Sequence, residues 1–580
     1  MYGQYVSWLS LARDLQITLT LSLTPTTRDL RMHRHNQGSR SGIIRRRDTS
    51  RLLDIGVLHP NWPLIHPASF SARSGCPGDS LGQAKYSPSF HCLQFTSRCH
   101  FTSGQSSLAN RFFTLPFDSY QIEGAVDKDG RGPSIWDTFC AIPGKIAHGA
   151  SGAVACDSYN RTHQDIALLK SLGATAYRFS ISWSRIIPIG GRNDPVNQAG
   201  IDHYVKFVDD LLDAGITPFI TLFHWDLPDG LDKRYGGLLN REEFPLDFEN
   251  YARIMFKAIP KCKHWITFNE PWCSSILGYN AGYFAPGHTS DRTKSTKGDS
   301  AREPWIVGHN ILVAHGRAVK TYREDFKPTQ GGEIGITLNG DAVYPWDPED
   351  PADVEACDRK IEFAISWFAD PVYFGKYPDS MIKQLGDKLP TFTEEERALV
   401  QGSNDFYGMN HYTANYIKHK KGVPPEDDFL GNLETLFYSK NNECIGAETQ
   451  SFWLRPNPQG FRDLINWLSK RYGYPKMYVT ENGTSIKGEN DMTKDQILED
   501  DFRVKYFHDY AHAMADAVEK DGCNVRGYLG WSLMDNFEWA EGYETRFGVT
   551  FVDYENGQER FPKKSAKSMK PLFDSLIKKD

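Results

Sequence analysis

Seven short apolar runs alternate with amphipathic segments from about Tyr120 onward, and this alternation restricts the possible folds most strongly. Each run is apolar at most positions, as expected of a strand buried on both faces of a parallel sheet. The runs are Ala174–Ser180, Ile216–Leu222, His264–Phe268, Glu333–Leu338, Asp405–Met409, Lys476–Thr480 and Val525–Gly530. Helical spacing marks Tyr159–Leu172, Asp202–Ala214, Phe248–Ala258, Pro304–Asp325 and Asp501–Asp521. The pattern predicts an α/β fold of one domain, a (β/α)8 TIM barrel that needs one further strand.

A basic N-terminal segment precedes this pattern. Residues 1–110 carry a formal charge of about +7, whereas the rest of the chain carries about −14. The segment is rich in Arg, Ser and His without a sustained period, so we predict a disordered, non-globular extension over residues 1–110 and the barrel over residues 111–580. A gene-model artefact, in which untranslated or intronic sequence has been read as protein, explains the segment more simply than an organelle transit peptide does.

Composition limits the expected cellular location of the protein and the classes of molecule it binds. Arg13 and Asp14 interrupt the apolar runs near the N-terminus, so we predict neither a signal-peptide core nor a membrane span, and the cytoplasm is the expected location. The ten cysteines form no CxxC pair, which fits a reducing compartment. The acidic body argues against nucleic acid as a partner and suits a neutral small molecule handled by carboxylates. The sequence does not predict an oligomeric state.

Two glutamates stand directly after apolar runs, where the catalytic groups of such barrels lie. Glu270 occurs in Thr-Phe-Asn-Glu-Pro-Trp over residues 267–272, and Glu481 in Tyr-Val-Thr-Glu-Asn-Gly over residues 478–483. Glycoside hydrolysis needs one carboxylic acid to protonate the leaving oxygen and a second carboxylate at the anomeric carbon. Taken singly, each glutamate is as well explained as part of an ordinary turn.

The two strings together, about 210 residues apart, resemble glycoside hydrolase family 1. Further matching blocks are Tyr-Gln-Ile-Glu-Gly at 120–124, Tyr-Arg-Phe-Ser-Ile-Ser-Trp-Ser-Arg at 177–185, Phe-His-Trp-Asp-Leu-Pro at 223–228, Asn-His-Tyr-Thr at 410–413 and Trp-Ser-Leu-Met-Asp-Asn-Phe-Glu-Trp at 531–539. The resemblance covers about residues 119–580, and intracellular fungal-type β-glucosidases are the members most similar to this chain. It implies a retaining β-glucosidase that hydrolyses cellobiose and aryl or alkyl β-glucosides through a covalent glycosyl-enzyme.

The resemblance also implies a role for each matching residue. Glu481 corresponds to the nucleophile, oriented by Arg178 and Tyr412, and Glu270 to the acid and base, with a raised pKa. The two carboxyls are then expected about 5–5.5 Å apart. Asn269 corresponds to the residue that binds the sugar 2-hydroxyl. The other sugar-binding positions are Gln121, His224, Asn410, Trp531, Glu538, Trp539 and Phe547, and the leaving-group positions are Trp272, Leu277 and Asn339. For Trp225, packing behind His224 and sugar contact both stay open.

The same residues exclude two related activities. Plant thioglucosidases have Gln in place of Glu270, and 6-phospho-glycosidases lack the acidic residue at Glu538, which would repel a phosphate. A neutral β-glucoside is therefore the expected substrate, and β-galactosides and β-fucosides are possible further ones because Gln121 and Glu538 can bind either orientation of the C4 hydroxyl. No metal and no organic cofactor is implied, because His224 corresponds to a hydroxyl-binding residue and no ligand cluster is present.

The stretch before Ser119 departs from the family pattern. Members usually open with a strand of the kind Phe-x-Trp-Gly-x-Ala-Thr-Ala, whereas residues 111–118 read Arg-Phe-Phe-Thr-Leu-Pro-Phe-Asp. Pro116 lacks an amide proton, and Asp118 places a charge where a small buried residue is expected. We therefore expect an aberrant first strand, with the family sequence beginning near Ser119. Two alternatives to a working enzyme follow: a catalytically impaired sugar-binding homologue, and an enzyme carried as cargo by a leader that recruits nucleic acid or an organelle receptor.

Overall fold

Eight parallel strands form one sheet in the computed structural model, which describes residues 112–576. The strands are β1 (Phe112–Thr114), β2 (Ala176–Ser180), β3 (Thr217–Phe223), β4 (His264–Asn269), β5 (Glu333–Asn339), β7 (Tyr407–Asn410), β10 (Met477–Glu481) and β11 (Val525–Leu529). Their order is β1-β11-β10-β7-β5-β4-β3-β2. β1 pairs with β11 at one end of this order and also lies against β2 at the other, so the sheet closes into the predicted barrel.

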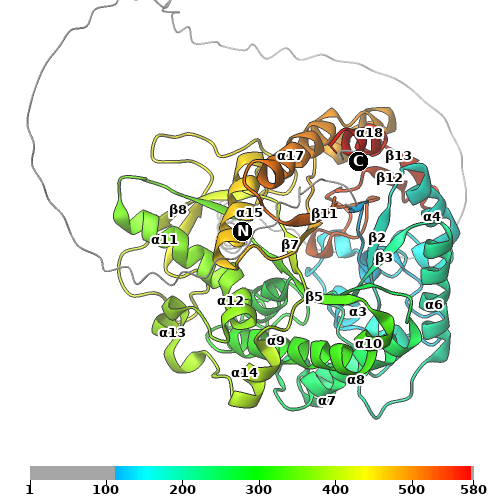
Figure 1. The fold of residues 1–580 in the computed structure, drawn as a ribbon, viewed down its shortest axis with the longest axis horizontal. Coiled ribbons are helices and arrows are strands. Elements are labelled where there is room, and N and C mark those ends of the chain that lie inside the picture. The colour runs from blue at the N-terminus through cyan, green and yellow to red at the C-terminus, as the bar shows by residue number, and fades with distance from the viewer. Residues whose placement is uncertain (1–111, 577–580) are drawn as a thin grey trace, which may run out of the picture. The chain divides into compact units, whose positions relative to one another are not determined.

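Helices surround the strands (Figure 1). The long ones are α4 (Thr162–Ser171), α6 (Gln198–Asp213), α8 (Phe244–Ala258), α9 (Glu303–Thr321), α11 (Pro351–Ile361), α15 (Pro458–Arg471), α17 (Asp501–Glu519) and α18 (Lys564–Leu576). Shorter ones are α2 (Ser119–Ile122), α3 (Ile135–Cys140), α5 (Trp183–Ile186), α7 (Asp229–Tyr235), α10 (Lys327–Gln330), α12 (Trp367–Phe374), α13 (Asp379–Leu385), α14 (Glu394–Val400) and α16 (Lys494–Leu498). Two small sheets lie outside the barrel: β6 (Ala342–Pro345), β8 (Ala414–His419) and β9 (Leu433–Leu436), and β12 (Thr550–Asp553) with β13 (Glu559–Pro562).

The helix α15 illustrates why these segments form where they do. Asn457 caps its N-terminus by accepting a hydrogen bond from the Gly460 N–H, and Pro458 occupies the first turn, where no amide proton is needed. Phe461, Leu464, Ile465 and Leu468 then recur at helical spacing and are buried. In the strands, by contrast, burial does not alternate, since all but the first residue of β3 are buried. This is the both-face burial that the apolar runs predict.

The seven predicted runs are all strands of the barrel, shifted by at most two residues at either end. The predicted helices are also present, and the missing eighth strand is β1. The helix-free stretch Gly422–Leu454 is more ordered than a plain loop, because β9 within it pairs antiparallel with β8. The segment 1–110 lies outside the described residues, so the proposed domain division stays a prediction.

The expectation of a disrupted first strand is wrong. Phe112, Phe113 and Thr114 pair in parallel register with Gly527, Tyr528 and Leu529 of β11. Pro116 follows this ladder, and the next amide, that of Phe117, donates to the Arg178 carbonyl at 2.8 Å. Pro116 therefore lies outside the paired residues of β1, where no amide proton is required. The hydrogen bond from Phe117 to Arg178 joins the chain after β1 to β2.

Asp118 is fully buried, as the sequence suggests, but its carboxyl is hydrogen-bonded. It accepts from the Tyr120 N–H at 2.8 Å, which caps α2, and from the Ser180 hydroxyl at 3.2 Å. Burial, followed by the neighbouring Asp226, holds the pKa of Asp118 well above its usual value. The fold therefore favours the neutral form of this side chain more than the unfolded chain does, which lowers the cost expected for a buried charge.

Asp118→Asn should raise stability at neutral pH and leave it nearly unchanged near pH 4. The folded state keeps the Asp118 proton to a higher pH than the unfolded chain does, so the free energy of unfolding falls as pH rises above about 3.8. Each unit of raised pKa corresponds to about 1.4 kcal/mol. Urea unfolding at pH 4.5 and 7.5 measures the effect. As a control, Asp347→Asn should show the opposite sign, because a hydrogen bond from Lys440 lowers the pKa of Asp347. Equal stabilities of Asp118→Asn and the parent at both pH values would refute the expectation.

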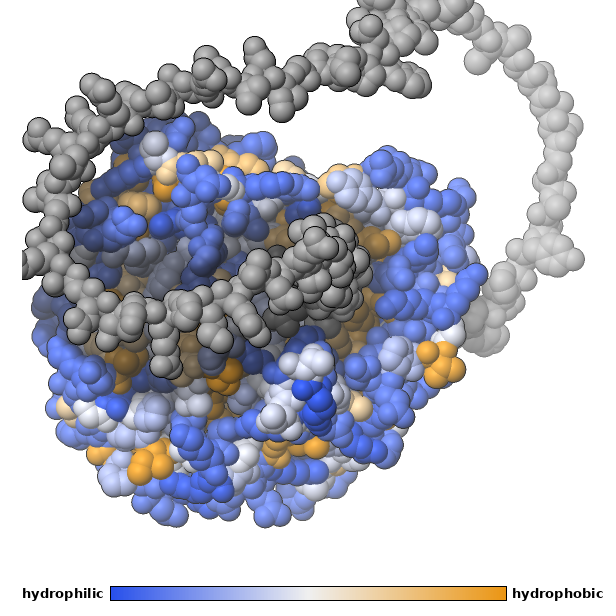
Figure 2. Space-filling view, turned by 180° about the vertical axis from the view of Figure 1, so that it is seen from behind, coloured by the Kyte–Doolittle hydropathy of each residue, from blue (hydrophilic) through white to orange (hydrophobic). Residues whose placement is uncertain are grey.

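Hydrophilic residues predominate on the face seen in Figure 2, and apolar residues are scattered among them. The large apolar side chains that are exposed, such as Val154 and Val423, are isolated from one another in sequence. Between residues 112 and 576, no helix has both the length and the apolar character required to cross a bilayer.

Candidate active site

Most of the predicted residues converge on one cavity at the carboxyl ends of the barrel strands. Glu270 directly follows β4, Glu481 ends β10 and Asn410 ends β7. Because all strands are parallel, these ends lie on the same side of the barrel. The cavity and its open mouth together hold about 440 Å³ of empty space. The lining residues are Gln121, His224, Trp225, Glu270, Tyr412, Trp453, Glu481, Trp531, Glu538, Trp539 and Phe547. Nine of these eleven lining residues were assigned to the site from the sequence, and a tenth, Trp225, was left open between packing and sugar contact.

Glu481 is held at both oxygens. Arg178 donates from Nη1 to Oε1 at 2.6 Å, and the Tyr412 hydroxyl donates to Oε2 at 2.8 Å. The Arg178 side chain is fully buried and that of Glu481 nearly so, so the ion pair is shielded from water. Both donors stabilise the charged carboxylate and fix its orientation. A carboxylate held in this way is suited to act as a nucleophile.

Glu270 has a different environment. Its Oε1 accepts from Asn410 Nδ2 at 2.7 Å and its Oε2 contacts the Cys273 thiol at 2.9 Å, so no cation binds it directly. Burial, followed by the charge of Glu481, raises the pKa of Glu270 to about 8. The predicted direction is confirmed, although burial outweighs the Glu481 charge that the sequence argument invoked. Its φ of +44° places Glu270 in the left-handed region, an uncommon conformation that functional sites often contain.

Asn269 connects the nucleophile to the sugar-facing side of the cavity. Its Oδ1 accepts from Arg178 Nη2 at 2.6 Å, and since a guanidinium only donates, this fixes which end of the amide is oxygen. Asn269 Nδ2 therefore donates to His224 Nε2 at 2.8 Å. Burial, followed by the Arg178 charge, lowers the pKa of His224 well below its usual value. The imidazole is thus neutral with its proton on Nδ1.

Three buried polar atoms of the cavity lining have no hydrogen-bond partner within residues 112–576. They are Gln121 Oε1, His224 Nδ1 and Glu538 Oε2. Buried polar atoms without partners are rare, and a polyhydroxylated ligand would satisfy all three. Gln121 is fixed by donating from Nε2 to Asn536 Oδ1 and the Phe537 carbonyl. Burial, followed by Glu541, raises the pKa of Glu538 well above its usual value.

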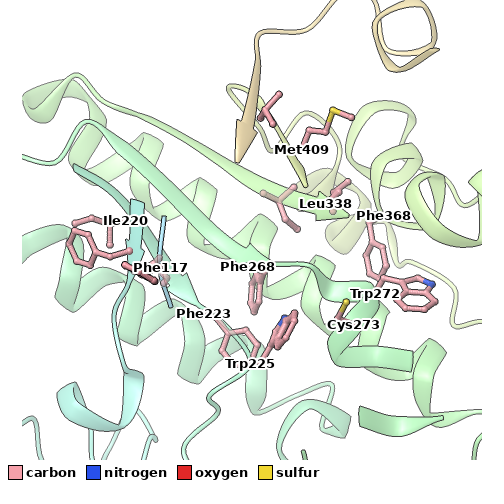
Figure 3. Packing of buried hydrophobic residues seen from close by; sticks show 14 of the residues in the cluster. Phe117, Ile220, Phe223, Trp225, Phe268, Trp272, Cys273, Leu338, Phe368 and Met409 are labelled. Carbon is pink, nitrogen blue, oxygen red and sulfur yellow. The ribbon is translucent and has the colours of Figure 1, made fainter. Parts of the chain in front are cut away.

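Aromatic rings form the walls of the cavity. Trp225 and Trp539 lie 4.6 Å apart between centroids, and Trp531 stands edge-on to Phe117 at 6.3 Å. Trp225 also donates from Nε1 to the Asn269 carbonyl at 2.9 Å, so it both packs and lines the cavity. Figure 3 shows Trp225 next to Phe268 of β4. Flat rings of this kind suit the apolar faces of a pyranose.

The three predicted leaving-group residues do not belong to this lining. Trp272 packs against Phe429 at a centroid distance of 6.2 Å, and Leu277 is fully buried in the core. Asn339 donates from Nδ2 to the Cys273 sulfur at 3.7 Å. Their role toward the leaving group stays a prediction.

Sequence reasoning missed two residues of the site. Trp453 lines the cavity and stands edge-on to Tyr412 at 5.8 Å. A tryptophan in the helix-free stretch 422–454 was the available signal. Cys273 contacts Glu270, and no pattern in the sequence indicates that contact. In the described part of the chain, three or more potential metal-ligating side chains never cluster together.

Comparison with known proteins agrees with this geometry. The model of Glycosyl hydrolase family 1 matches residues 109–578. β-Glucosidase 1B of Phanerodontia chrysosporium is 54% identical over 79% of this chain and 84% of its own length. The crystal structure of a β-glucosidase from Humicola insolens in complex with glucose is 83% identical, covers 81% of this chain and 99% of its own, and has a TM-score of 0.81. A rice β-glucosidase mutant in a covalent complex with glucose is 42% identical over 81% of this chain and 98% of its own, with a TM-score of 0.77. The match from residue 109 corrects the expected start near Ser119.

Proposed function

This chain belongs to glycosyl hydrolase family 1 and is a retaining β-glucosidase, and from that premise we propose that Glu481 is its nucleophile and Glu270 its acid and base. The observation that carries the assignment is the contrast between the two carboxyls of one cavity. Arg178 and Tyr412 both donate hydrogen bonds to Glu481, whereas Glu270 is buried without a cation and its pKa is raised to about 8. Two carboxyls with opposite environments are what this reaction requires.

In the first step, Glu481 attacks the anomeric carbon while Glu270 gives its proton to the glycosidic oxygen. The bond from the anomeric carbon to the leaving oxygen breaks, the aglycone leaves as an alcohol, and an ester joins the sugar to Glu481. Arg178 then faces an ester in place of a carboxylate. The covalent glucose complex of the rice relative supports such an intermediate.

In the second step, Glu270 takes a proton from a water molecule that attacks the anomeric carbon. Esterification has removed the negative charge of Glu481, one of the causes of the raised pKa of Glu270. The carboxyl that acted as an acid is now the base. Two inversions give net retention, so ¹H NMR of the first product should show β-glucose before mutarotation, and α-glucose as the first product would refute the scheme.

The glucosyl unit would be recognised by the partnerless atoms of the lining. His224 presents an N–H donor from Nδ1, while Gln121 Oε1 and Glu538 Oε2 are acceptors for sugar hydroxyls. Trp531 supplies an apolar face, and Phe547 and Trp539 close the cavity. A site built to hydrogen-bond hydroxyls discriminates strongly against sugars that lack them.

Replacing Glu538 by Gln should lower kcat/KM for p-nitrophenyl β-glucoside by about 10- to 100-fold, because a neutral amide hydrogen-bonds a sugar hydroxyl less strongly than an ionisable carboxyl does. The β-galactoside and β-fucoside should lose activity together with the glucoside if Glu538 binds the C4 hydroxyl in both orientations. Steady-state kinetics with the three substrates gives the comparison. Glu544→Gln, an exposed glutamate paired with His148, is the control and should behave as the parent enzyme. A loss confined to one of the three substrates would contradict the shared C4 contact.

Cellobiose and small aryl or alkyl β-glucosides are the proposed substrates, and cellulose breakdown with a cytoplasmic location is the proposed setting. The cavity is small and partly open to solvent, which supports a single glucosyl unit at the non-reducing end. The proposal of a cytoplasmic location is supported by the scattered cysteines, of which those in the described residues are free thiols. The partner is a small β-glucoside, and neither nucleic acid nor a membrane surface is proposed.

The alternative of a catalytically impaired sugar-binding homologue has no support. It depended on a damaged first strand, whereas β1 pairs with β11 and Gln121 keeps two hydrogen bonds that orient it. The cargo alternative concerns residues 1–110, which lie outside the described residues. Deleting residues 1–104 tests it, since an unchanged kcat/KM together with a changed cellular location is what a leader would give.

A further inference from the structure

The Cys273 thiol lies against the carboxyl proposed as the acid and base. Cys273 is fully buried and begins η4 (Cys273–Leu277), a single π-helical turn that starts three residues after Glu270. Its Sγ is 2.9 Å from Glu270 Oε2, and its backbone N–H donates to the Glu270 carbonyl at 2.9 Å. The backbone bond and the side-chain contact therefore close the same short turn. Figure 3 shows Cys273 and Trp272 side by side on this segment, close to the strand that carries Phe268.

The direction of the thiol hydrogen bond follows from its neighbours. Asn339 Nδ2 approaches the Cys273 sulfur at 3.7 Å, and an amide nitrogen only donates, so the sulfur accepts there. The S–H is then available to donate to Glu270 Oε2. Asn410 Nδ2 donates to the other oxygen, Oε1, at 2.7 Å. Each oxygen of Glu270 thus receives one donor, and the two donors come from different elements, β7 and η4.

The thiol stays protonated while it does this. Burial, followed by the charge of Glu270, holds the pKa of Cys273 well above its usual value, so S–H is the form present over the working pH range. Several other charged or titratable groups also act on the pair. The charges of Glu481 and Arg178 act on Glu270. The charge of Glu270 in turn acts on Tyr412 and Glu538. The charges of Glu481 and Asp341 act on Cys273. Within the described residues, Arg178 is the only positively charged group among those that act on Glu270 or Cys273.

We propose that Cys273 is a positioning residue for Glu270, whose thiol holds the Oε2 oxygen and sets the pH at which the enzyme loses its acid. This rests on the acid and base role proposed for Glu270. A donor to a carboxylate stabilises the charged form, so the thiol lets Glu270 release its proton more readily to the glycosidic oxygen. The thiol proton itself is not transferred. After the aglycone leaves, the same contact holds the carboxylate in place to accept the proton of the attacking water.

Cys273→Ala should move the basic limb of the kcat/KM profile for p-nitrophenyl β-glucoside upward by about half a pH unit to one unit. That limb reports the free enzyme's acid. Cys273→Val, which has nearly the same volume but no donor, should give the same upward shift, so a loss of packing in the alanine variant does not decide the result. Cys273→Ser, which keeps a donor, should return the limb to or below its original position.

Cys262→Ala is the matched control, because Cys262 is equally buried but contacts the backbone carbonyls of Pro218 and His264 in place of a carboxyl. It should leave the pH profile unmoved. If Ala and Val at position 273 leave the limb in place, or if Cys262→Ala moves it equally, the inference fails. Glu270→Gln separates this failure from failure of the proposed function: the limb should vanish there if Glu270 is the acid, whatever the Cys273 variants show.

Discussion

Glu481→Gln is expected to lower kcat for p-nitrophenyl β-glucoside by on the order of 10⁴-fold or more, as loss of a covalent nucleophile does. The amide cannot form the glycosyl ester, because its oxygen carries no negative charge and is a poor nucleophile. The fold should survive the change. The amide oxygen can face Arg178 and its NH₂ can face the Tyr412 hydroxyl, so both neighbours keep a partner.

A buried glutamate outside the cavity gives the control for this substitution. Glu489 is also buried and ion-paired, with Arg503 at 2.8 Å and Lys563 at 2.7 Å. Glu489→Gln should lower the melting temperature while each folded molecule keeps its kcat. A similar kcat loss in both variants would mean that the Glu481 effect is structural.

Azide tests the direction of attack. In Glu481→Ala, azide can enter the space left by the carboxyl and attack the substrate directly, which inverts the anomeric centre and gives α-glucosyl azide. NMR of the product decides the point, and β-glucosyl azide from this variant would contradict the assignment of Glu481.

Glu270→Ala is expected to lower the rate for cellobiose and alkyl β-glucosides by about 10²- to 10⁴-fold, the usual contribution of general acid catalysis. An alkoxide leaves poorly without a proton, whereas dinitrophenolate leaves readily. The first step with 2,4-dinitrophenyl β-glucoside should therefore be much less affected, and a burst of dinitrophenol should precede slow turnover. Added azide should speed that turnover and yield β-glucosyl azide, because it attacks the glycosyl-enzyme on the face that water uses. An equal loss for all leaving groups would show that Glu270 does not act as the acid.

The same residue should limit stability. Because the pKa of Glu270 is raised to about 8, the folded state binds a proton that the unfolded chain releases above about pH 4.5. The free energy of unfolding therefore falls between about pH 4.5 and about pH 8. Glu270→Gln should then melt at a higher temperature than the parent at pH 7.5 and at nearly the same temperature at pH 4.5. A variant that melts lower at pH 7.5 would contradict this account.

The long, regular parts of this molecule could be predicted from the sequence. Strands buried on both faces lose the alternating period but keep a continuous apolar run, which is why β3, β4 and β10 were found. The two glutamates could be placed because strand ends in a parallel barrel share one side. The family blocks contain nine of the lining residues, including both glutamates.

The misses have local physical causes. The strand β1 has three residues, too few for any period, and Pro116 drew attention to a position that lies outside the ladder. Nothing in residue order reveals the positive φ of Glu270 or the π-helical turn that brings Cys273 to it, since an ordinary helical pattern also places positions three apart together. Burial raises the pKa of Glu270 more than the Glu481 charge does. The size of that effect depends on how completely the folded chain shields Glu270 from water, which residue order does not show.

The shared amide of Asn269 has a consequence for redesign. The Arg178 guanidinium donates to the nucleophile Glu481 and also to Asn269 Oδ1. The second bond orients the Asn269 amide, which donates to His224 Nε2 and so places the imidazole proton on Nδ1. Attack and sugar preference are therefore mechanically linked on this side of the cavity, and a mutation there changes two traits at once. Glu538, on the segment that follows β11, takes no part in these three hydrogen bonds. A substitution at that position leaves the link between Arg178, Asn269 and His224 intact, but it still acts on the two catalytic carboxyls, whose charges reach Glu538.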